Sequence, residues 1–190
     1  STHTIQKETP VMTSDASSLA TSDTGVLRDQ FLSAMSRVPL SVAVVVAGAP
    51  DARIALTVGT FISVSADPPM VLVAVKSGSP LYSAVSQHRR FVINVLSCGQ
   101  VEHSERFSGR PRTGRPYDLA EARWIRAAGE TQRFLEGAVA AFDCELVEAR
   151  SIASHVLLIG RVDEIVAGED HPLVYCSRAY GTLSPLAGAV

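Results

Sequence analysis

The sequence predicts a mostly β protein whose short strands form a barrel, with a few helices at its periphery. Apolar runs rich in β-branched residues recur along the chain, turn signals separate them at regular intervals, and few segments show helical spacing. Many short strands separated in this way predict a closed barrel. The periodicity indicates the architecture and leaves the ligand open.

The N-terminal part is predicted to differ from the rest of the chain. Residues 1–24 are rich in Ser, Thr and Asp, so we expect them to form a disordered arm ahead of a single domain at 25–190. Thr24 can cap a helix that Pro39 ends. The apolar residues of this helix recur at helical spacing: Leu27, Phe31, Leu32 and Met35.

The predicted strands are apolar, and β-branched residues are frequent in them. They span residues 42–47, 54–57, 61–65, 70–76, 90–96, 139–149, 155–166 and 173–176. Short helices are expected at 80–87 and 100–107. Residues 108–116 are dense in Gly, Pro and Arg, which predicts a loop, and the tail from Ser184 is expected to be loose.

Size and charge narrow the classes of function. A chain of 190 residues with 46% hydrophobic residues is expected to bury one core. The formal net charge of −2 leaves no basic excess, which argues against nucleic acid or an anionic membrane surface as a partner. No apolar stretch reaches the ~18 residues that span a bilayer. No secretory signal is recognisable, so we expect a cytoplasmic location.

Several common kinds of site find no support in the sequence. Cys98, Cys144 and Cys176 are scattered without CxxC spacing, and the histidines lack the spacing of metal ligands. We therefore expect neither a disulfide framework nor a metal site. The chain also has no Gly-x-Gly-x-x-Gly and no P-loop, which disfavours a Rossmann dehydrogenase.

The segment from Ala55 to Lys76 carries the strongest functional signal. Short hydroxyl residues and a glycine come before the pair Pro68-Pro69, and an apolar strand follows. These residues are Thr57, Gly59, Thr60, Ser63 and Ser65. Hydroxyls and open backbone suit hydrogen bonding to a flat polar ligand at a sheet edge. An edge strand and turn without a ligand is the structural alternative.

This segment resembles the flavin-binding segment of the short-chain flavin reductases, whose pattern is approximately Gly-x-Thr-Ala-x-Ser-Phe-x-Ser-Val-Ser-x-x-Pro-Pro-Leu-Val. Further blocks between Leu27 and Leu183 are similar in the same order. They are 35–46, 91–96, 137–144, 155–160 and a closing block at 175–183 that is similar to x-x-x-Gly-x-Tyr-x-x-Leu. The resemblance implies an FMN-binding split β-barrel, as a homodimer with the flavin near the subunit interface.

The resemblance also implies an activity and its cofactors. The chain would be an NAD(P)H:flavin oxidoreductase that transfers a hydride from NADH or NADPH to FMN or FAD. It would supply the reduced flavin to a partner monooxygenase. Besides the hydroxyl segment, the residues implied to contact the cofactors are Lys76, Ser77, Ser79, Phe107, Arg110 and Tyr180, with Arg178 beside Tyr180.

Two of these residues have equally plain alternatives. Phe107 either flanks the cofactor or packs in the core. Arg110 belongs to a group of arginines around the Gly/Pro loop, with Arg106, Arg112 and Arg115, and a solvated basic loop is the more common outcome for any one of them. We select Arg110 as the phosphate-binding candidate.

His155 is the implied catalytic residue, beside the nicotinamide. The family pattern has Gly-Asp-His where this chain has Ala153-Ser154-His155, so the carboxylate that could orient or charge the imidazole is missing. A second hypothesis is therefore a flavin-binding split-barrel protein without reductase activity. A third is an enzyme like pyridoxamine-phosphate oxidase, which shares the barrel; the Pro68-Pro69 block speaks against it.

Overall fold

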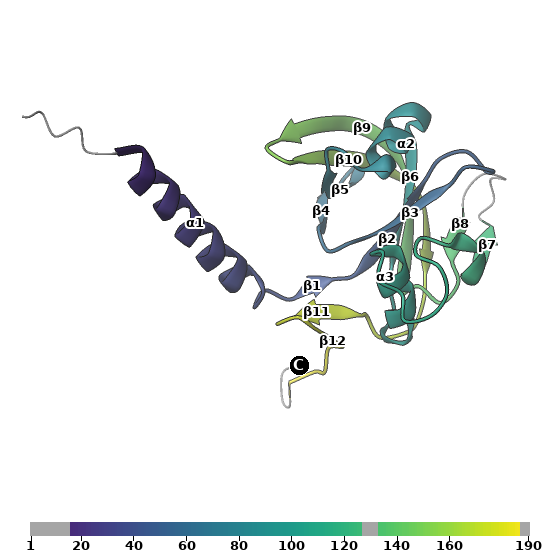
Figure 1. Cartoon of the computed structure of the whole chain (residues 1–190). Helices are drawn as coiled ribbons and strands as arrows, with labels where there is room; N and C mark the ends of the chain where they lie inside the picture. Colours follow the sequence, from purple (N-terminus) through teal and green to yellow (C-terminus); the bar gives the residue numbers. More distant parts are fainter. Residues whose placement is uncertain (1–15, 127–132, 187–190) are drawn as a thin grey trace, which may run out of the picture. The chain divides into compact units, whose positions relative to one another are not determined.

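The computed structural model describes residues 16–126 and 133–186 (Figure 1). The chain divides into two units, one up to Val38 and one from Pro39. The first contains helix α1 (Ala16–Met35), so the end of the arm predicted at 1–24 is helical. Alanine and leucine are strong helix formers, and Ala16, Leu19 and Ala20 extend the helix N-terminal to Thr24. The part of the predicted arm at 1–15 lies outside the described residues.

The second unit is built on a seven-stranded antiparallel sheet with the strand order β3-β2-β6-β9-β10-β5-β4. Its strands are β2 (Ala43–Ala47), β3 (Ile54–Val58), β4 (Phe61–Ala66), β5 (Pro69–Lys76), β6 (Arg90–Val95), β9 (Ala140–Ile152) and β10 (His155–Ala167). Each corresponds to a predicted strand. In Figure 1, β9 and β10 form a long hairpin that extends beyond the other strands.

The two edge strands, β3 and β4, are consecutive in the sequence and are joined at Gly59 and Thr60. Within residues 16–126 and 133–186 no hydrogen-bonded ladder joins these two strands. The expectation of a closed barrel was therefore wrong. The physical reason lies at Thr60, whose carbonyl accepts from the Ala74 N–H at 3.3 Å and whose hydroxyl donates to the Ala74 oxygen at 2.9 Å. The chain thus turns from β3 toward β5.

One face of the sheet packs against helix α2 (Pro80–His88). Val45, Val73 and Leu158 are 0% exposed and form one cluster with Leu81 of α2. Burying such a side chain contributes ~2 kcal/mol, so this cluster holds the strands together. Ser79 caps α2 by accepting a hydrogen bond from the Leu81 N–H at 3.2 Å.

The other face of β2 and β6 packs against helix α3 (Val101–Phe107) and a hairpin of β7 (Trp124–Arg126) and β8 (Arg133–Leu135). A second sheet has the order β1-β11-β12, with β1 (Leu40–Ser41), β11 (Val174–Cys176) and β12 (Ala179–Gly181). Strands β1, β7, β8 and β12 were not predicted, because two or three residues are too few to show alternation. None of the helices in the described ranges is long and apolar enough to cross a bilayer.

Candidate active site

A cavity of about 480 Å³ is lined by residues of β3, of α3 and the loop after it, and of the hairpin β11–β12. Its volume is in the range of small-molecule sites. The predicted cofactor-binding residues that line it are Thr57, Gly59, Arg110 and Tyr180. The other polar residues of its wall are Ser104, Glu105, Ser108, Tyr175 and Arg178.

Hydrogen bonds made by hydroxyl groups hold three elements around this cavity. The Thr57 hydroxyl on β3 donates to the Ser104 carbonyl on α3 at 2.8 Å. The Ser104 hydroxyl and the Tyr180 hydroxyl lie 2.9 Å apart, which ties α3 to β12. The Tyr180 ring in turn packs edge-on against Tyr175, with the ring centroids 5.1 Å apart. Thr57 and Tyr180 are therefore part of one rigid wall.

The loop that carries Arg110 is held by a buried arginine. Arg106 is 2% exposed, and its guanidinium donates to Glu102 at 3.0 Å and to the Arg115 carbonyl at 3.3 Å. The Arg106 carbonyl also accepts from the Tyr117 N–H at 3.1 Å. Arg106 therefore shapes the loop from inside, whereas Arg110 lines the cavity.

Gly114 is required by this arrangement. Its φ is +75°, and a Cβ at this position would lie 2.7 Å from the Arg106 Nη1 atom. A side chain here would displace the buried guanidinium and strain the backbone. The Gly/Pro loop predicted from composition is therefore ordered around Arg106.

A second group of predicted residues lies at one end of three neighbouring strands. Lys76 at the end of β5 is paired in register with His155 at the start of β10. Thr60 precedes β4 and bonds to Ala74, two residues before Lys76. Because Gly59 lines the cavity and is followed directly by Thr60, the two groups adjoin at this turn.

The environment of His155 shows what replaces the missing carboxylate. The Ser154 hydroxyl lies 2.9 Å from His155 Nδ1, and the imidazole is exposed. The hydroxyl can orient the ring by this hydrogen bond, but it adds no charge. Among the described residues no group of histidine, cysteine and carboxylate side chains could hold a metal ion.

The remaining predicted residues are not in the cavity wall. Ser63 on β4 is exposed, and the Ser65 hydroxyl bonds to the backbone of Asp67 at 3.2 Å. Ser77 is exposed beside Lys76, and Ser79 is the buried cap of α2. Phe107 is 0% exposed, with its ring centroid 6.1 Å from that of Trp124. Of the two roles considered for Phe107, the structure has core packing, because a fully buried ring leaves no face for a ligand.

Residues 35–184 match the family model described as the flavin reductase like domain. The chain belongs to this family. The match covers most of the second unit, including every residue of the cavity wall.

The family includes curated relatives of nearly the same extent. The NADH-dependent FMN reductase AsuE2 of Streptomyces nodosus subsp. asukaensis is 38% identical over 160 residues, which are 82% of this chain and 85% of that protein. The FMN reductase (NADH) SmoA of Agrobacterium fabrum is 32% identical over 154 residues, 81% of this chain and 85% of that protein.

Solved structures of the family share the fold. The flavin reductase PheA2 superposes with a TM-score of 0.74 at 27% identity, over 83% of this chain and 98% of that one. BorF, the flavin reductase component of a bacterial two-component tryptophan halogenase, gives a TM-score of 0.73 at 28% identity, over 86% and 100%. The predicted split barrel is thereby confirmed.

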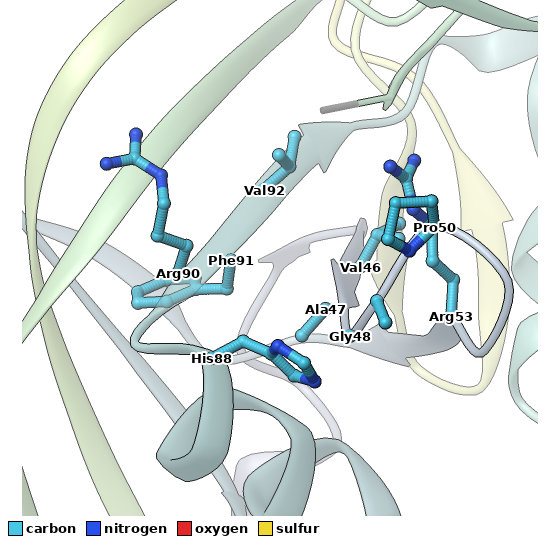
Figure 2. Close-up of a pocket in the computed structure, with 10 residues that line it drawn as sticks. Val46, Ala47, Gly48, Pro50, Arg53, His88, Arg90, Phe91 and Val92 are labelled. Atoms are coloured by element: carbon cyan, nitrogen blue, oxygen red, sulfur yellow. The ribbon is translucent and has the colours of Figure 1, made fainter. Parts of the chain in front are cut away.

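A second cavity of about 240 Å³ lies where β2 and β6 meet the turn between β2 and β3 (Figure 2). Figure 2 shows Arg53, His88 and Arg90 around the apolar side chains of Val46 and Val92. None of the residues predicted to bind the flavin or nicotinamide lines it. The larger of these two cavities is therefore the candidate active site.

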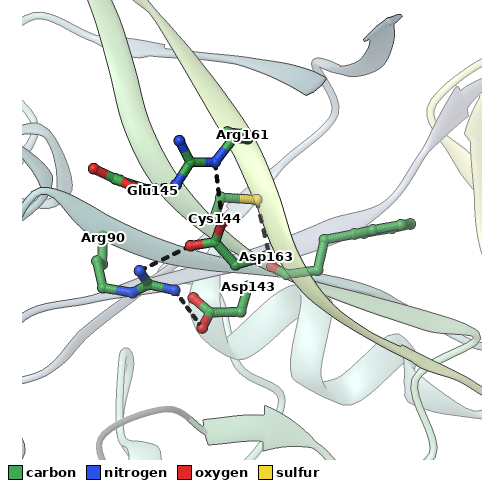
Figure 3. Close-up of polar contacts among 7 residues, drawn as sticks. Arg90, Asp143, Cys144, Glu145, Arg161 and Asp163 are labelled. Carbon is green, nitrogen blue, oxygen red and sulfur yellow. Dashed lines mark hydrogen bonds and ion pairs between the residues drawn. The ribbon is translucent and has the colours of Figure 1, made fainter. Parts of the chain in front are cut away.

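Arg90 leads from this second cavity into an ion-pair network across β6, β9 and β10 (Figure 3). Its guanidinium donates to Asp143 at 2.7 Å and to Asp163 at 3.0 Å. Arg161 donates to Asp163 at 3.1 Å and pairs with Glu145. Each charged group of this cluster has a partner within the cluster, with three carboxylates paired to two guanidinium groups.

Burial and pairing act in opposite directions in this network. Burial raises the pKa of Asp143 and outweighs the hydrogen bond from Arg90. The pKa of Asp163 is lowered: burial alone would raise it, but the hydrogen bonds from Arg161 and Arg90 together outweigh burial. Burial raises the pKa of Cys144 to about 12, which leaves this thiol protonated and unreactive at neutral pH.

Sequence reasoning missed Ser104 and Glu105 as wall residues and Arg106 as the support of the loop. Ser104 and Glu105 lie in a segment predicted only as a helix, and their orientation toward the cavity depends on how α3 packs on β2 and β3. Arg106 was grouped with solvated loop arginines. The available signal was Glu102 at i−4 on the same helix face.

Proposed function

We propose that this chain is an NADH-dependent flavin reductase that reduces FMN and releases it to a partner monooxygenase. The main support is a cavity of about 480 Å³ that is lined by the edge strand β3, short hydroxyl side chains and two arginines. This cavity lies in a chain of the flavin reductase-like family. When both cofactors are bound, the flavin accepts a hydride from the nicotinamide. No side chain has to act as a nucleophile.

The donor set of the cavity fits a flavin nucleotide. Strand β3 is a sheet edge, so its outward backbone N–H and C=O groups are available to the polar edge of a flat ring. Thr57 uses its hydroxyl proton on Ser104 and keeps its lone pairs to accept a hydrogen bond. Gly59 has no Cβ to hold the ligand away from the backbone. Thr60, Ser63 and Ser65 would continue this edge along the ribityl chain.

A phosphate group would be held by cations near the cavity. In the described part of the chain, Arg110 makes no side-chain hydrogen bond or ion pair, so its guanidinium is available for bidentate binding. Lys76 and Ser77 would supply further donors at the end of β5. Ser79, the buried cap of α2, would support them, since its N–H donates to the Lys76 carbonyl at 2.9 Å. Tyr180, tied to Ser104, would close the cavity wall.

His155 would hold the nicotinamide. It lies at the strand end that adjoins Gly59 and Thr60, and the Ser154 hydroxyl fixes one of its ring nitrogens. An oriented imidazole donates a hydrogen bond and packs against a planar ring without needing a charge. This arrangement favours reductase activity over the alternative of a flavin-binding protein without it.

The relatives favour one cofactor pair. The curated relatives AsuE2 and SmoA are both described as NADH-dependent FMN reductases. A 31% identical protein of Thermus thermophilus is the reductase component of 4-hydroxyphenylacetate 3-monooxygenase. We therefore select NADH and FMN, and a flavin-dependent monooxygenase as the recipient of reduced flavin. A cytoplasmic location would give the enzyme its NADH.

A homodimer is part of the proposal. Ile62, Leu72 and Ile159 lie side by side on β4, β5 and β10, and Ile62 is 57% exposed. Leu72 and Ile159 are half-buried, and a partly exposed apolar row on a sheet can form an interaction surface. A second copy on this row would bring a second chain close to Ser63 and Thr60. Light scattering should therefore give twice the chain mass of 20.2 kDa.

The test is NADH oxidation followed at 340 nm with purified protein and added FMN. Flavin-dependent loss of NADH is expected, with FAD and NADPH as the comparison cofactors. FMN binding without NADH oxidation would favour the alternative without reductase activity. No binding and no oxidation with any of the four cofactors would refute both and leave only the fold.

A further inference from the structure

The turn between β11 and β12 is built from residues that rarely adopt its conformation. Ser177 has a φ of 51° and Arg178 a φ of 63°, both in the left-handed region. Cys176 and Ala179 are paired across the hairpin, so these two residues form a two-residue turn. Such turns favour Asn-Gly or Gly-Gly, because both central residues need a positive φ. This chain has Ser-Arg instead.

The second turn residue faces the larger cavity. Arg178 lines the same cavity as Arg110, and in the described residues neither guanidinium has a hydrogen bond or ion pair. The carboxylate of the wall, Glu105, is engaged by Arg112, whose Nε lies 2.7 Å from it. Two unpaired guanidinium groups therefore remain at the cavity, beside a carboxylate that is already neutralised.

The positive φ of Arg178 and its place in the cavity wall both indicate that its side chain has a role at the cavity. A non-glycine residue held at positive φ costs stability relative to glycine, and such residues gather at ligand sites where the side chain is needed. Arg178 thus occupies a strained turn position from which its side chain lines the cavity.

We propose that Arg178 is a specificity-determining residue that binds, with Arg110, a phosphate group of a nucleotide cofactor. This rests on the proposed function. The shared chemistry is a phosphoester, which either FMN or the pyrophosphate of NADH could supply. A guanidinium suits it because its paired N–H groups match two phosphate oxygens.

The test compares two glycine variants of the same turn. Arg178→Gly relieves the strain and removes the guanidinium, whereas Ser177→Gly relieves the strain and leaves Arg178 in place. We expect both to keep or raise the melting temperature, by about 2 °C. Only Arg178→Gly should weaken binding, by about tenfold. A merely structural role of Arg178 predicts that the two variants behave alike.

Three ligands identify the source of the phosphate. The dissociation constants of FMN and riboflavin are measured by flavin fluorescence, and the KM for NADH by absorbance. A tenfold loss for FMN with riboflavin unchanged supports binding of the flavin phosphate. A raised KM for NADH with FMN unchanged supports binding of the dinucleotide. Unchanged values for FMN and NADH, or equal losses for FMN and riboflavin, overturn the proposal.

The proposed function and this inference can fail separately. If the wild-type protein oxidises NADH with FMN and Arg178→Gly leaves the Kd for FMN and the KM for NADH unchanged, only the role of Arg178 is refuted. If the wild-type protein binds FMN more tightly than riboflavin but does not oxidise NADH, the reductase activity is refuted. Loss of the preference for FMN in Arg178→Gly would then still support phosphate binding by Arg178. Wild-type protein that binds neither flavin nor NADH refutes both.

Discussion

The larger cavity and the Arg90 network are both polar regions of the same unit, but they use their charges differently. In the network, Arg90 and Arg161 pair with Asp143, Asp163 and Glu145 over the surface of the sheet (Figure 3). At the cavity, Arg110 and Arg178 form no ion pair with a carboxylate of the described residues. Charges that are paired with one another stabilise a fold, whereas unpaired charges beside a cavity are available to a ligand.

The first test of this difference between the two regions removes the most buried residue of the network. Asp143 is 4% exposed, and Asp143→Ala leaves a guanidinium N–H of Arg90 without its partner. We expect the free energy of unfolding to fall by about 2 kcal/mol, measured by urea denaturation. The KM for FMN should not change.

Asp143→Asn is the matched control, because the amide oxygen can still accept the hydrogen bond from Arg90. It should cost less than Asp143→Ala, since burial already disfavours the charge of Asp143. An effect of Asp143→Ala on the KM for FMN as large as its effect on stability would contradict the separation of the two regions.

The converse experiment removes an unpaired charge at the cavity. Arg110→Ala should raise the KM for FMN about tenfold, because a charge-assisted hydrogen bond to phosphate is lost. The free energy of unfolding should stay within about 0.5 kcal/mol, as for other exposed positions. Arg115→Ala, in the same loop but outside the cavity wall, is the control. A drop in stability without a change in KM would place Arg110 among the structural residues.

His155→Ala tests the nicotinamide side of the site. It should raise the KM for NADH about fivefold, since one positioned hydrogen bond is worth about 1 kcal/mol. FMN binding, measured by fluorescence, should be unchanged. Ser154→Ala should give a smaller change in the same direction, because it removes only the group that orients the ring. Loss of FMN binding in His155→Ala would move this residue to the flavin.

The smallest effect concerns acid stability. The pKa of Asp163 is lower in the folded protein than its ordinary value of 3.8, so ionised Asp163 stabilises the fold above that pH. The contribution is lost as the pH falls through the folded value. The stability difference between wild type and Asp163→Asn should therefore be constant near neutral pH and shrink below about pH 4. A difference that grows on acidification would show that the sign is wrong.

Much of the fold could be predicted because its signals are local. The apolar β-branched run before Lys76 predicts a strand wherever it is placed, and Ser79-Pro80 predicts a helix start from capping alone. Other features depend on partners distant in sequence. Phe107 could be assigned to a ligand or to the core from sequence, and only its contact with Trp124 and the cluster around it decides for the core.

The sequence by itself determined the seven strands of the large sheet and the two helices after β5 and β6. Through six blocks in order it also determined the family. The tertiary structure decided that β3 and β4 do not pair with each other and that Arg106 is buried whereas Arg110 is not. It also decided that Arg178, in the turn before β12, lines the cavity. The physical reason is the distance along the sequence over which each kind of interaction acts. Periodicity, capping and turn preferences act within a few residues, whereas burial and charge pairing depend on which distant segments the sheet brings together.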